Sequence, residues 1–202
     1  MRKYLPIVII LGVLAILFFW FISIKNGAVR VNQDVSKEWG NVETTYQRRN
    51  DLIGNLVKTV QGSADFEKST LEAVIKARSE ATSVKIDPTN ITPEQLAQFN
   101  QAQGNLNSSL SRLLVTVEQY PDLKSNQNFL KLQDELASTE NQILTARTRF
   151  NESVQKYNNY ILVFPNSLFL GNYKEKPYFD AVAGAEKPVD VNFNFDNKED
   201  KK

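Results

Sequence analysis

Residues 5–24 read LPIVIILGVLAILFFWFISI, a run of twenty residues without a charged side chain. A helix rises about 1.5 Å per residue, so this run would extend over about 30 Å, the thickness of a bilayer's hydrocarbon core. Arg2 and Lys3 precede the run and Lys25 follows it. The run predicts an N-terminal membrane anchor, within residues 1–26, that tethers the rest of the chain.

Two other interpretations of the apolar run are a cleaved signal peptide and a buried core helix. A signal peptide has an apolar stretch of about 7–15 residues before a small-residue cleavage site. This run is longer, and Asn26-Gly27-Ala28 makes a poor site. A core helix normally keeps a polar face, which this run lacks. A lipid-modified N-terminus is excluded because the chain has no cysteine.

The charges around the run leave the orientation in the membrane open. Arg2 and Lys3 favour an N-terminus inside and a domain outside, whereas Lys25, Arg30 and Lys37 favour the reverse. We therefore expect a single-pass protein of the cell membrane, with the side of the soluble domain undecided.

The composition excludes several function classes. The net charge is +1 and no basic stripe is present, which argues against nucleic-acid binding. The chain has no histidine and no cysteine. Histidine-dependent and thiol-dependent nucleophiles, thiolate metal sites and the HExxH zinc motif are therefore absent. No glycine-rich phosphate loop occurs either. We expect no catalytic centre, no cofactor, no metal and no small-molecule substrate.

Carboxylates are the remaining candidates for catalysis, and their best cluster is Asp134, Glu135 and Glu140. Adjacent residues point about 100° apart on a helix, so Asp134 and Glu135 do not form a pair. The cluster is better explained as a solvated helix face. A carboxylate-dependent enzyme is accordingly a remote alternative.

Beyond the anchor, apolar residues recur at spacings of three and four, the period of helices that pack lengthwise on one another. The first such stripe predicts a helix over about residues 28–62, broken only at Arg49. Gly62 is suited to end this helix and Asp65 to cap the next. The second stripe predicts a shorter helix that ends near Val84.

Two further helices follow. Thr92-Pro93-Glu94-Gln95 predicts a helix start, with Thr92 as the N-cap and Gln95 completing a capping box. That helix should end before Pro121. The last stripe predicts a helix from about Ser125 to Tyr160. Four amphipathic segments with short connections predict an all-α fold, an antiparallel four-helix bundle over residues 27–163.

Two arginines interrupt the apolar stripes, Arg49 and Arg78. In one interpretation their aliphatic stems pack and their guanidinium groups reach water. In the other they form a buried polar layer that fixes the helix register, with Glu118, Glu135 or Glu140 as the partner. Both interpretations remain open at this point.

Residues 164–202 form an irregular tail, rich in phenylalanine and then charged, and we expect its end to be disordered. Its aromatic and proline residues either contact a partner or cap the open end of the bundle. The candidates for partner contact are Phe164, Pro165, Phe169, Tyr178 and Phe179.

Several of these segments also match the motifs of a known family. Residues 48–57, RRNDLIGNLV, resemble the RRxDLIPNLV motif of bacterial LemA-family proteins, and residues 120–124, YPDLK, match another of its motifs. Further similarity lies at residues 77–79, 128–133, 139–151, 164–165 and 178–188. Gly54 stands where the family usually has proline, and Phe150 where it usually has tyrosine. Gly54 should loosen the helix locally.

The resemblance implies a four-helix bundle on a membrane anchor, and it does not supply an enzymatic activity. The function that we expect is a membrane-tethered, non-catalytic scaffold or adaptor that contacts an unknown protein partner. The alternative is a structural protein of the cell envelope that contacts lipid.

Overall fold

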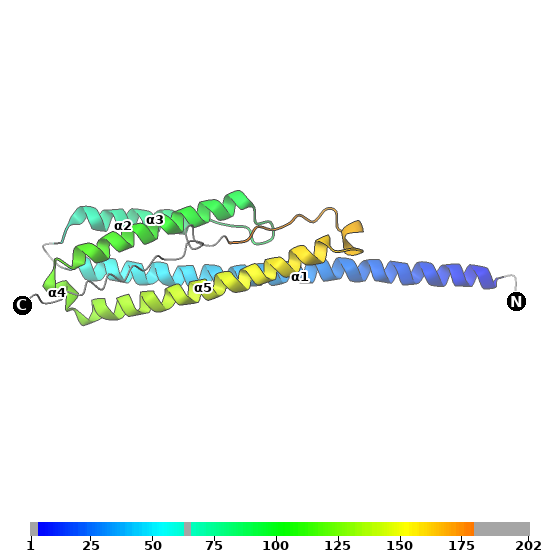
Figure 1. Cartoon of the computed structure of the whole chain (residues 1–202), viewed down its shortest axis with the longest axis horizontal. Helices are drawn as coiled ribbons and strands as arrows, with labels where there is room; N and C mark the ends of the chain where they lie inside the picture. The colour runs from blue at the N-terminus through cyan, green and yellow to red at the C-terminus, as the bar shows by residue number, and fades with distance from the viewer. Residues whose placement is uncertain (1–3, 63–65, 180–202) are drawn as a thin grey trace, which may run out of the picture.

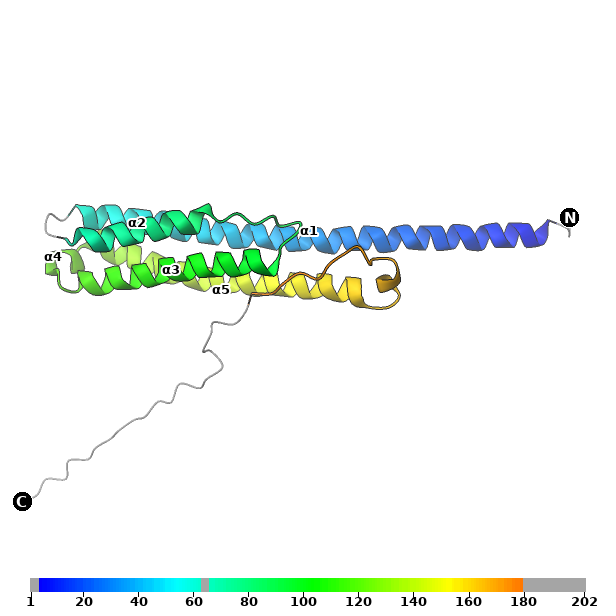
Figure 2. The same cartoon turned by 90° about the horizontal axis from the view of Figure 1, so that it is seen from above.

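A computed structural model describes residues 4–62 and 66–179, in which the regular elements are all helical. The elements are α1 (Leu5–Gln61), α2 (Lys68–Ser83), α3 (Pro93–Val117), α4 (Pro121–Lys124), α5 (Gln127–Leu162) and the 3₁₀ turn η1 (Asn166–Leu168). Helices α1, α2, α3 and α5 run up, down, up and down (Figures 1 and 2). The predicted all-α four-helix bundle is confirmed.

Helix α1 is the longest element, with 57 residues, and it crosses the expected boundary between anchor and bundle without a break. Its N-terminal part projects alone beyond the other helices (Figure 1). The helix also continues through Gly54, the position at which the sequence predicts a looser helix. The guanidinium group of Arg78 covers this glycine, and a Cβ atom here would lie 3.2 Å from Arg78 Cζ.

Local sequence sets most of the helix ends. Thr92 and Gln95 form the predicted capping box at the start of α3. The side chain of Asn126 accepts hydrogen bonds from the backbone amides of Asn128 and Phe129 at the start of α5. Pro121 follows the end of α3 and begins the short helix α4. The expected cap at Asp65 and the expected disorder near the C-terminus fall outside the described residues.

The buried apolar side chains form two clusters along the bundle axis. The first cluster lies near the anchor and joins the middle of α1 to the second half of α5, with Val35, Trp39 and Phe150 among its members. The second joins the end of α1 to α2, α3 and the start of α5, with Leu56 and Leu113 among its members.

Helices α2 and α3 are shorter than α1 and α5, and other segments complete the cluster nearer the anchor. The α2–α3 loop contributes Ile86 and Ile91, and the tail contributes Leu170 and Phe179. The tail segment, residues 170–179, runs back along the bundle from the end of α5 (Figure 1). It is therefore part of the folded domain.

Candidate functional site

A polar layer separates the two apolar clusters, and Arg49 is at its centre. Only 4% of the Arg49 surface is exposed. Its Nη1 donates a hydrogen bond to Glu140 Oε1 on α5 at 3.0 Å, and its Nη2 donates to Gln103 Oε1 on α3. The Gln103 amide in turn donates to the carbonyl of Ala81 on α2 at 3.5 Å. The layer thus connects all four long helices.

Tyr46 lies one turn before Arg49 on α1 and joins the same layer. The Arg49 guanidinium carbon is 5.0 Å from the centre of its ring. Burial raises the pKa of the Tyr46 hydroxyl above its usual value, although the nearby Arg147 and Arg49 oppose the rise. The phenol is therefore neutral at physiological pH, and the charged groups around it are Arg147, Arg49 and Glu140.

The structure does not bring the other predicted members to this layer. Arg78 is half-exposed on α2, where its Nε donates to the carbonyl of Asn50 at 2.7 Å. Glu118 pairs instead with Lys124 at the surface between α3 and α4. Glu135 is only half-buried, a turn before Glu140 on α5. Of the three predicted carboxylates Glu140 contacts Arg49, and Gln103, a polar residue on the α3 stripe, is a second partner that was not expected.

The five aromatic and proline candidates of the tail lie in different environments. Phe179 is 4% exposed and stacks on Trp39 with ring centres 6.0 Å apart, so its side chain is part of the core and does not face a partner. Phe169 packs against rings of the anchor. Pro165 is half-buried. Phe164 and Tyr178 are exposed, at 73% and 43%.

Two asparagines of α5 hold the tail to the bundle. Asn151 donates to the carbonyl of Phe179 at 3.0 Å and accepts from its amide at 2.8 Å. Asn158 makes the same pair with Lys176, at 2.9 Å in both directions. Each asparagine side chain thus pairs with both the backbone amide and the backbone carbonyl of one tail residue, as a neighbouring β-strand would. The sequence analysis did not identify this role of Asn151 and Asn158. The one signal in the sequence is that two asparagines lie seven residues apart on the same helix, and so on the same face.

We expect Asn158→Ala to release the tail without unfolding the bundle, because it leaves the buried amide and carbonyl of Lys176 unpaired, at about 1–3 kcal/mol. Limited trypsin digestion should then cut at Lys174 faster than in the parent. Asn159→Ala is the matched control, since the Asn159 side chain is exposed. Equal cutting rates in the two variants would contradict the role of Asn158.

Lys176 also fastens the tail to the α2–α3 loop. Its ammonium donates to the carbonyls of Pro88 and Thr89, at 3.2 and 2.8 Å. It lies 5.3 Å from the centre of the Tyr157 ring. Burial lowers the pKa of Lys176 below its usual value, and the negative charge of Asp87 partly opposes this.

This shift predicts a pH dependence. Between the lowered pKa of Lys176 in the folded chain and its ordinary value of 10.5, the unfolded chain binds more protons. The contribution of Lys176 to stability therefore rises with pH across this window. As the pH rises from 8 to 10, the melting temperature of the parent should increase relative to that of Lys176→Met. If the difference between the two melting temperatures stays constant across this range, Lys176 makes no such pH-dependent contribution to stability.

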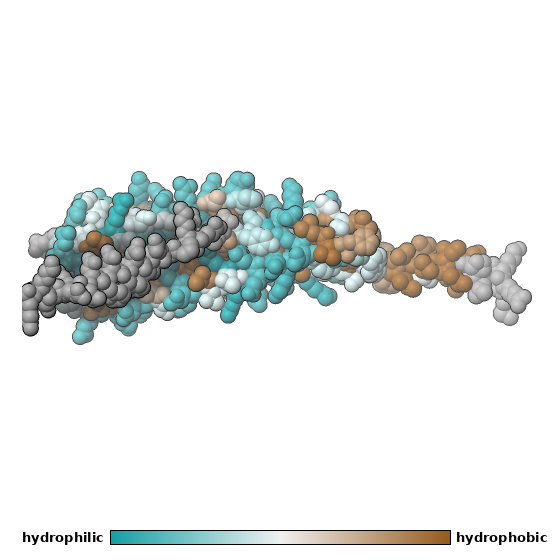
Figure 3. All heavy atoms as spheres, in the orientation of Figure 1, coloured by the Kyte–Doolittle hydropathy of each residue, from teal (hydrophilic) through white to brown (hydrophobic). Residues whose placement is uncertain are grey.

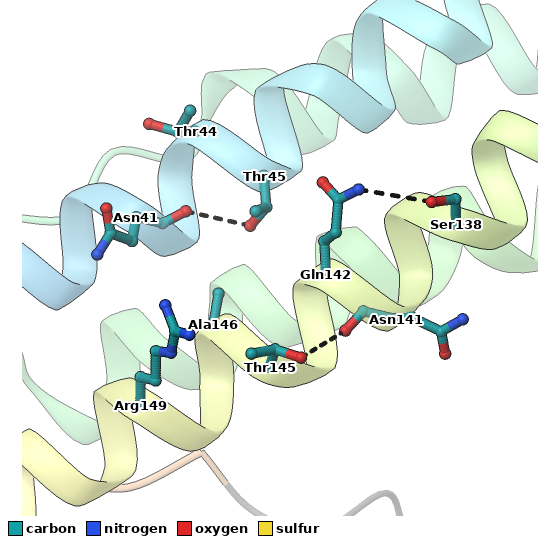
Figure 4. Close-up of a pocket in the computed structure, with 9 residues that line it drawn as sticks. All are labelled: Asn41, Thr44, Thr45, Ser138, Asn141, Gln142, Thr145, Ala146 and Arg149. Carbon is teal, nitrogen blue, oxygen red and sulfur yellow. Dashed lines mark hydrogen bonds between the residues drawn. The ribbon is translucent and has the colours of Figure 1, made fainter.

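A polar groove runs between α1 and α5 on the outside of the bundle (Figure 4). It has a volume of about 490 Å³. Every lining residue but Ala146 is polar, and Arg149 is the one charged member. The lining residues are Asn41, Thr44, Thr45, Ser138, Asn141, Gln142, Thr145, Ala146 and Arg149.

The groove presents amide and hydroxyl groups. The hydroxyls of Thr45 and Thr145 donate to carbonyls of their own helices, at 3.2 and 3.0 Å, so neither is held by a general base. Within residues 4–62 and 66–179, no three carboxylates come together as a metal site would require. Among the same residues, α1 is the one helix long and apolar enough to cross a membrane.

Comparison with known proteins agrees with the motifs and the fold. The chain is 28% identical over 183 residues to magnetosome protein MamQ 2 of Paramagnetospirillum magneticum (strain ATCC 700264 / AMB-1), covering 81% of this chain and 67% of that protein. It is 24% identical over 164 residues to Protein LemA of Metamycoplasma hominis, covering 81% and 71%. The sequence profile of the LemA family matches residues 38–193. The chain therefore belongs to the LemA family.

Proposed function

We propose that the chain is a membrane-tethered, non-catalytic scaffold that presents the groove between α1 and α5 to a protein partner. The observation that carries the proposal is the single helix α1, which is apolar and exposed over residues 7–20 and lines the groove over residues 41–45. One rigid element thus connects the anchor to the recognition surface. At about 1.5 Å per residue, Asn41 lies about 25 Å along the helix from Ile24.

The chemistry of the groove favours a protein surface over a small ligand. Small-molecule sites are enclosed and mostly apolar, with a few polar groups. This groove is lined by amides and hydroxyls, and one cation, Arg149, lies at its edge. Such a surface suits a polar partner that carries one acidic group. Contact through it leaves the buried core undisturbed.

The groove replaces the tail as the proposed partner contact. Phe179 is in the core, and Phe169 packs on the anchor. Of the five tail candidates, Phe164 and Tyr178 are the most exposed. A partner that needed all five would have to unfold the tail, at the cost of the Asn151 and Asn158 contacts.

A photo-reactive residue at Ser138, inside the groove, tests the proposal in cells that make the full chain. We expect it to capture a discrete partner, and Arg149→Glu in the same chain to abolish that capture. Ser108 on α3 is the matched control, because it is an exposed serine outside the groove. Equal capture at Ser108 and Ser138, or capture that survives Arg149→Glu, would contradict recognition by the groove.

The alternative function, contact with lipid by the domain itself, is favoured by a different observation. Large apolar side chains are exposed at the end of the bundle that faces the anchor. The two functions use different surfaces, so one chain can carry both.

A further inference from the structure

The turn between α5 and the tail exposes an unusual number of large apolar side chains. Over residues 162–169, Leu162 is 52% exposed, Val163 58%, Phe164 73% and Leu168 69%. No charged residue occurs between Lys156 and Lys174. A contiguous apolar surface of this kind marks a contact with a protein or a membrane.

This turn lies directly beside the anchor. The ring of Phe169 is 5.7 Å from that of Trp20 and 5.7 Å from that of Phe21, centre to centre. The hydroxyl of Tyr160 donates to the carbonyl of Ile24 at 3.1 Å. The hydrophobic surface of the anchor continues onto this end of the bundle (Figure 3).

Close packing fixes the turn in this position. A Cβ atom at Gly27 would lie 1.9 Å from the Tyr160 hydroxyl oxygen, so glycine at this position leaves room for the Tyr160 ring beside α1. Ile24 is consequently 4% exposed, although it belongs to the apolar run. The last turn of the run, residues 20–24, therefore has α5 and η1 against one side.

The length of the anchor decides where the membrane boundary lies. The part of the run before this contact, residues 5–19, extends over about 22 Å. The hydrocarbon core is about 30 Å thick. For α1 to cross it, residues 20–24 must also lie within the membrane, and the apolar turn beside them is carried to the same depth.

The backbone of the turn is suited to this environment, in which an unpaired amide or carbonyl is costly. The amides of Ser167, Leu168 and Phe169 donate to carbonyls within the turn, at 3.2, 3.2 and 2.9 Å. The Asn166 side chain donates to the carbonyl of Tyr160 at 3.1 Å. These three amides and the Asn166 side chain are thus satisfied within the protein.

Cationic and aromatic residues border the turn on the side away from the anchor. The Lys25 ammonium lies 5.7 Å from the centre of the Phe21 ring and 5.4 Å from that of Tyr173. Lys174 follows directly in the sequence. Aromatic and basic side chains are typical of the headgroup level of a membrane.

We propose that residues 162–169, here called the lipid loop, insert into the membrane beside α1. The domain then contacts the bilayer at two points, which fixes its orientation and the direction in which its groove faces. The inference rests on the proposed membrane anchor, and it assigns the exposed apolar side chains to lipid.

The test uses the absence of cysteine, which lets one introduced cysteine carry a single label. Full-length variants Leu168→Cys and Val163→Cys are labelled with an environment-sensitive fluorophore and reconstituted into phosphatidylcholine vesicles. Ser138→Cys reports a position on the bundle far from the anchor, and Leu14→Cys reports the anchor itself. Quenching by iodide on both sides of the vesicle is compared with quenching by lipids that carry a spin label on the acyl chain.

We expect iodide to quench the labels at positions 168 and 163 several-fold less than the label at 138, and lipid spin labels to quench them several-fold more. If the labels at positions 168 and 163 behave like the label at 138 while the label at 14 is quenched by lipid, the insertion of the lipid loop is contradicted and the membrane anchor is supported. If position 14 is also exposed to iodide, both proposals fail. Protection from iodide without lipid quenching would assign the loop to a protein contact and overturn the inference.

Discussion

Replacing Phe179 with alanine is expected to lower the free energy of unfolding by about 3–5 kcal/mol, the usual cost of removing a buried phenylalanine. Its ring contacts those of Trp39, Phe99 and Phe150, with centres 6.0, 6.4 and 5.3 Å apart. Arg147 also lies over it, with its guanidinium carbon 4.6 Å from the ring centre. Thermal unfolding of the full chain in detergent, followed by circular dichroism, measures the loss.

Tyr178→Ala is the control for this prediction. Tyr178 is adjacent and aromatic, but its side chain is 43% exposed. Its hydroxyl accepts a long hydrogen bond from Asn158, at 3.4 Å. We expect Tyr178→Ala to lower the free energy of unfolding by less than about 1 kcal/mol. Equal effects of the two substitutions would show that the tail does not complete the core.

Arg49→Met is expected to lower the free energy of unfolding by about 1–3 kcal/mol, because it leaves the buried Gln103 oxygen without its donor. For a chain of this size, each kcal/mol lowers the melting temperature by about 2–4 °C. The broken ion pair with Glu140 contributes less to this loss of stability. The Glu140 side chain is 47% exposed, so water can hydrogen-bond to its carboxylate in place of Arg49.

The double variant Arg49→Met/Gln103→Leu separates a polar layer from ordinary packing. When both partners become apolar, the buried Gln103 oxygen is no longer left without a donor, so part of the lost stability should return. Glu140→Gln is the second control and should change the free energy of unfolding by less than about 1 kcal/mol. An unchanged melting temperature for Arg49→Met would contradict a buried layer.

The sequence predicted the helices well because their signals are local. Apolar spacing, the capping box at Thr92 and Pro121 each act within one or two turns of the chain, and the observed helix ends lie close to those expected. Sequence reasoning also selected Arg49, because a charge on an apolar stripe is conspicuous without a structure.

The remaining parts of the site depend on contacts between distant segments. The choice of Glu140 and Gln103 as partners of Arg49 follows from how the helices pack, which the stripes alone do not specify. The position of the tail depends on Asn151 and Asn158 and on the space left by the short helices α2 and α3. Phe164 and Phe179 looked alike in sequence, yet one is exposed and the other is buried.

The central claim is that a folded helical domain is tethered to a membrane by the first part of α1. Liposome flotation tests it directly by comparing the full chain with a chain that begins at Gly27. We predict that the full chain floats and resists extraction at alkaline pH, whereas the shortened chain, which keeps only the lipid loop, is extracted at alkaline pH and keeps a strongly helical circular dichroism spectrum. A full chain that remains in the dense fraction, or a shortened chain that is unfolded, would contradict the account.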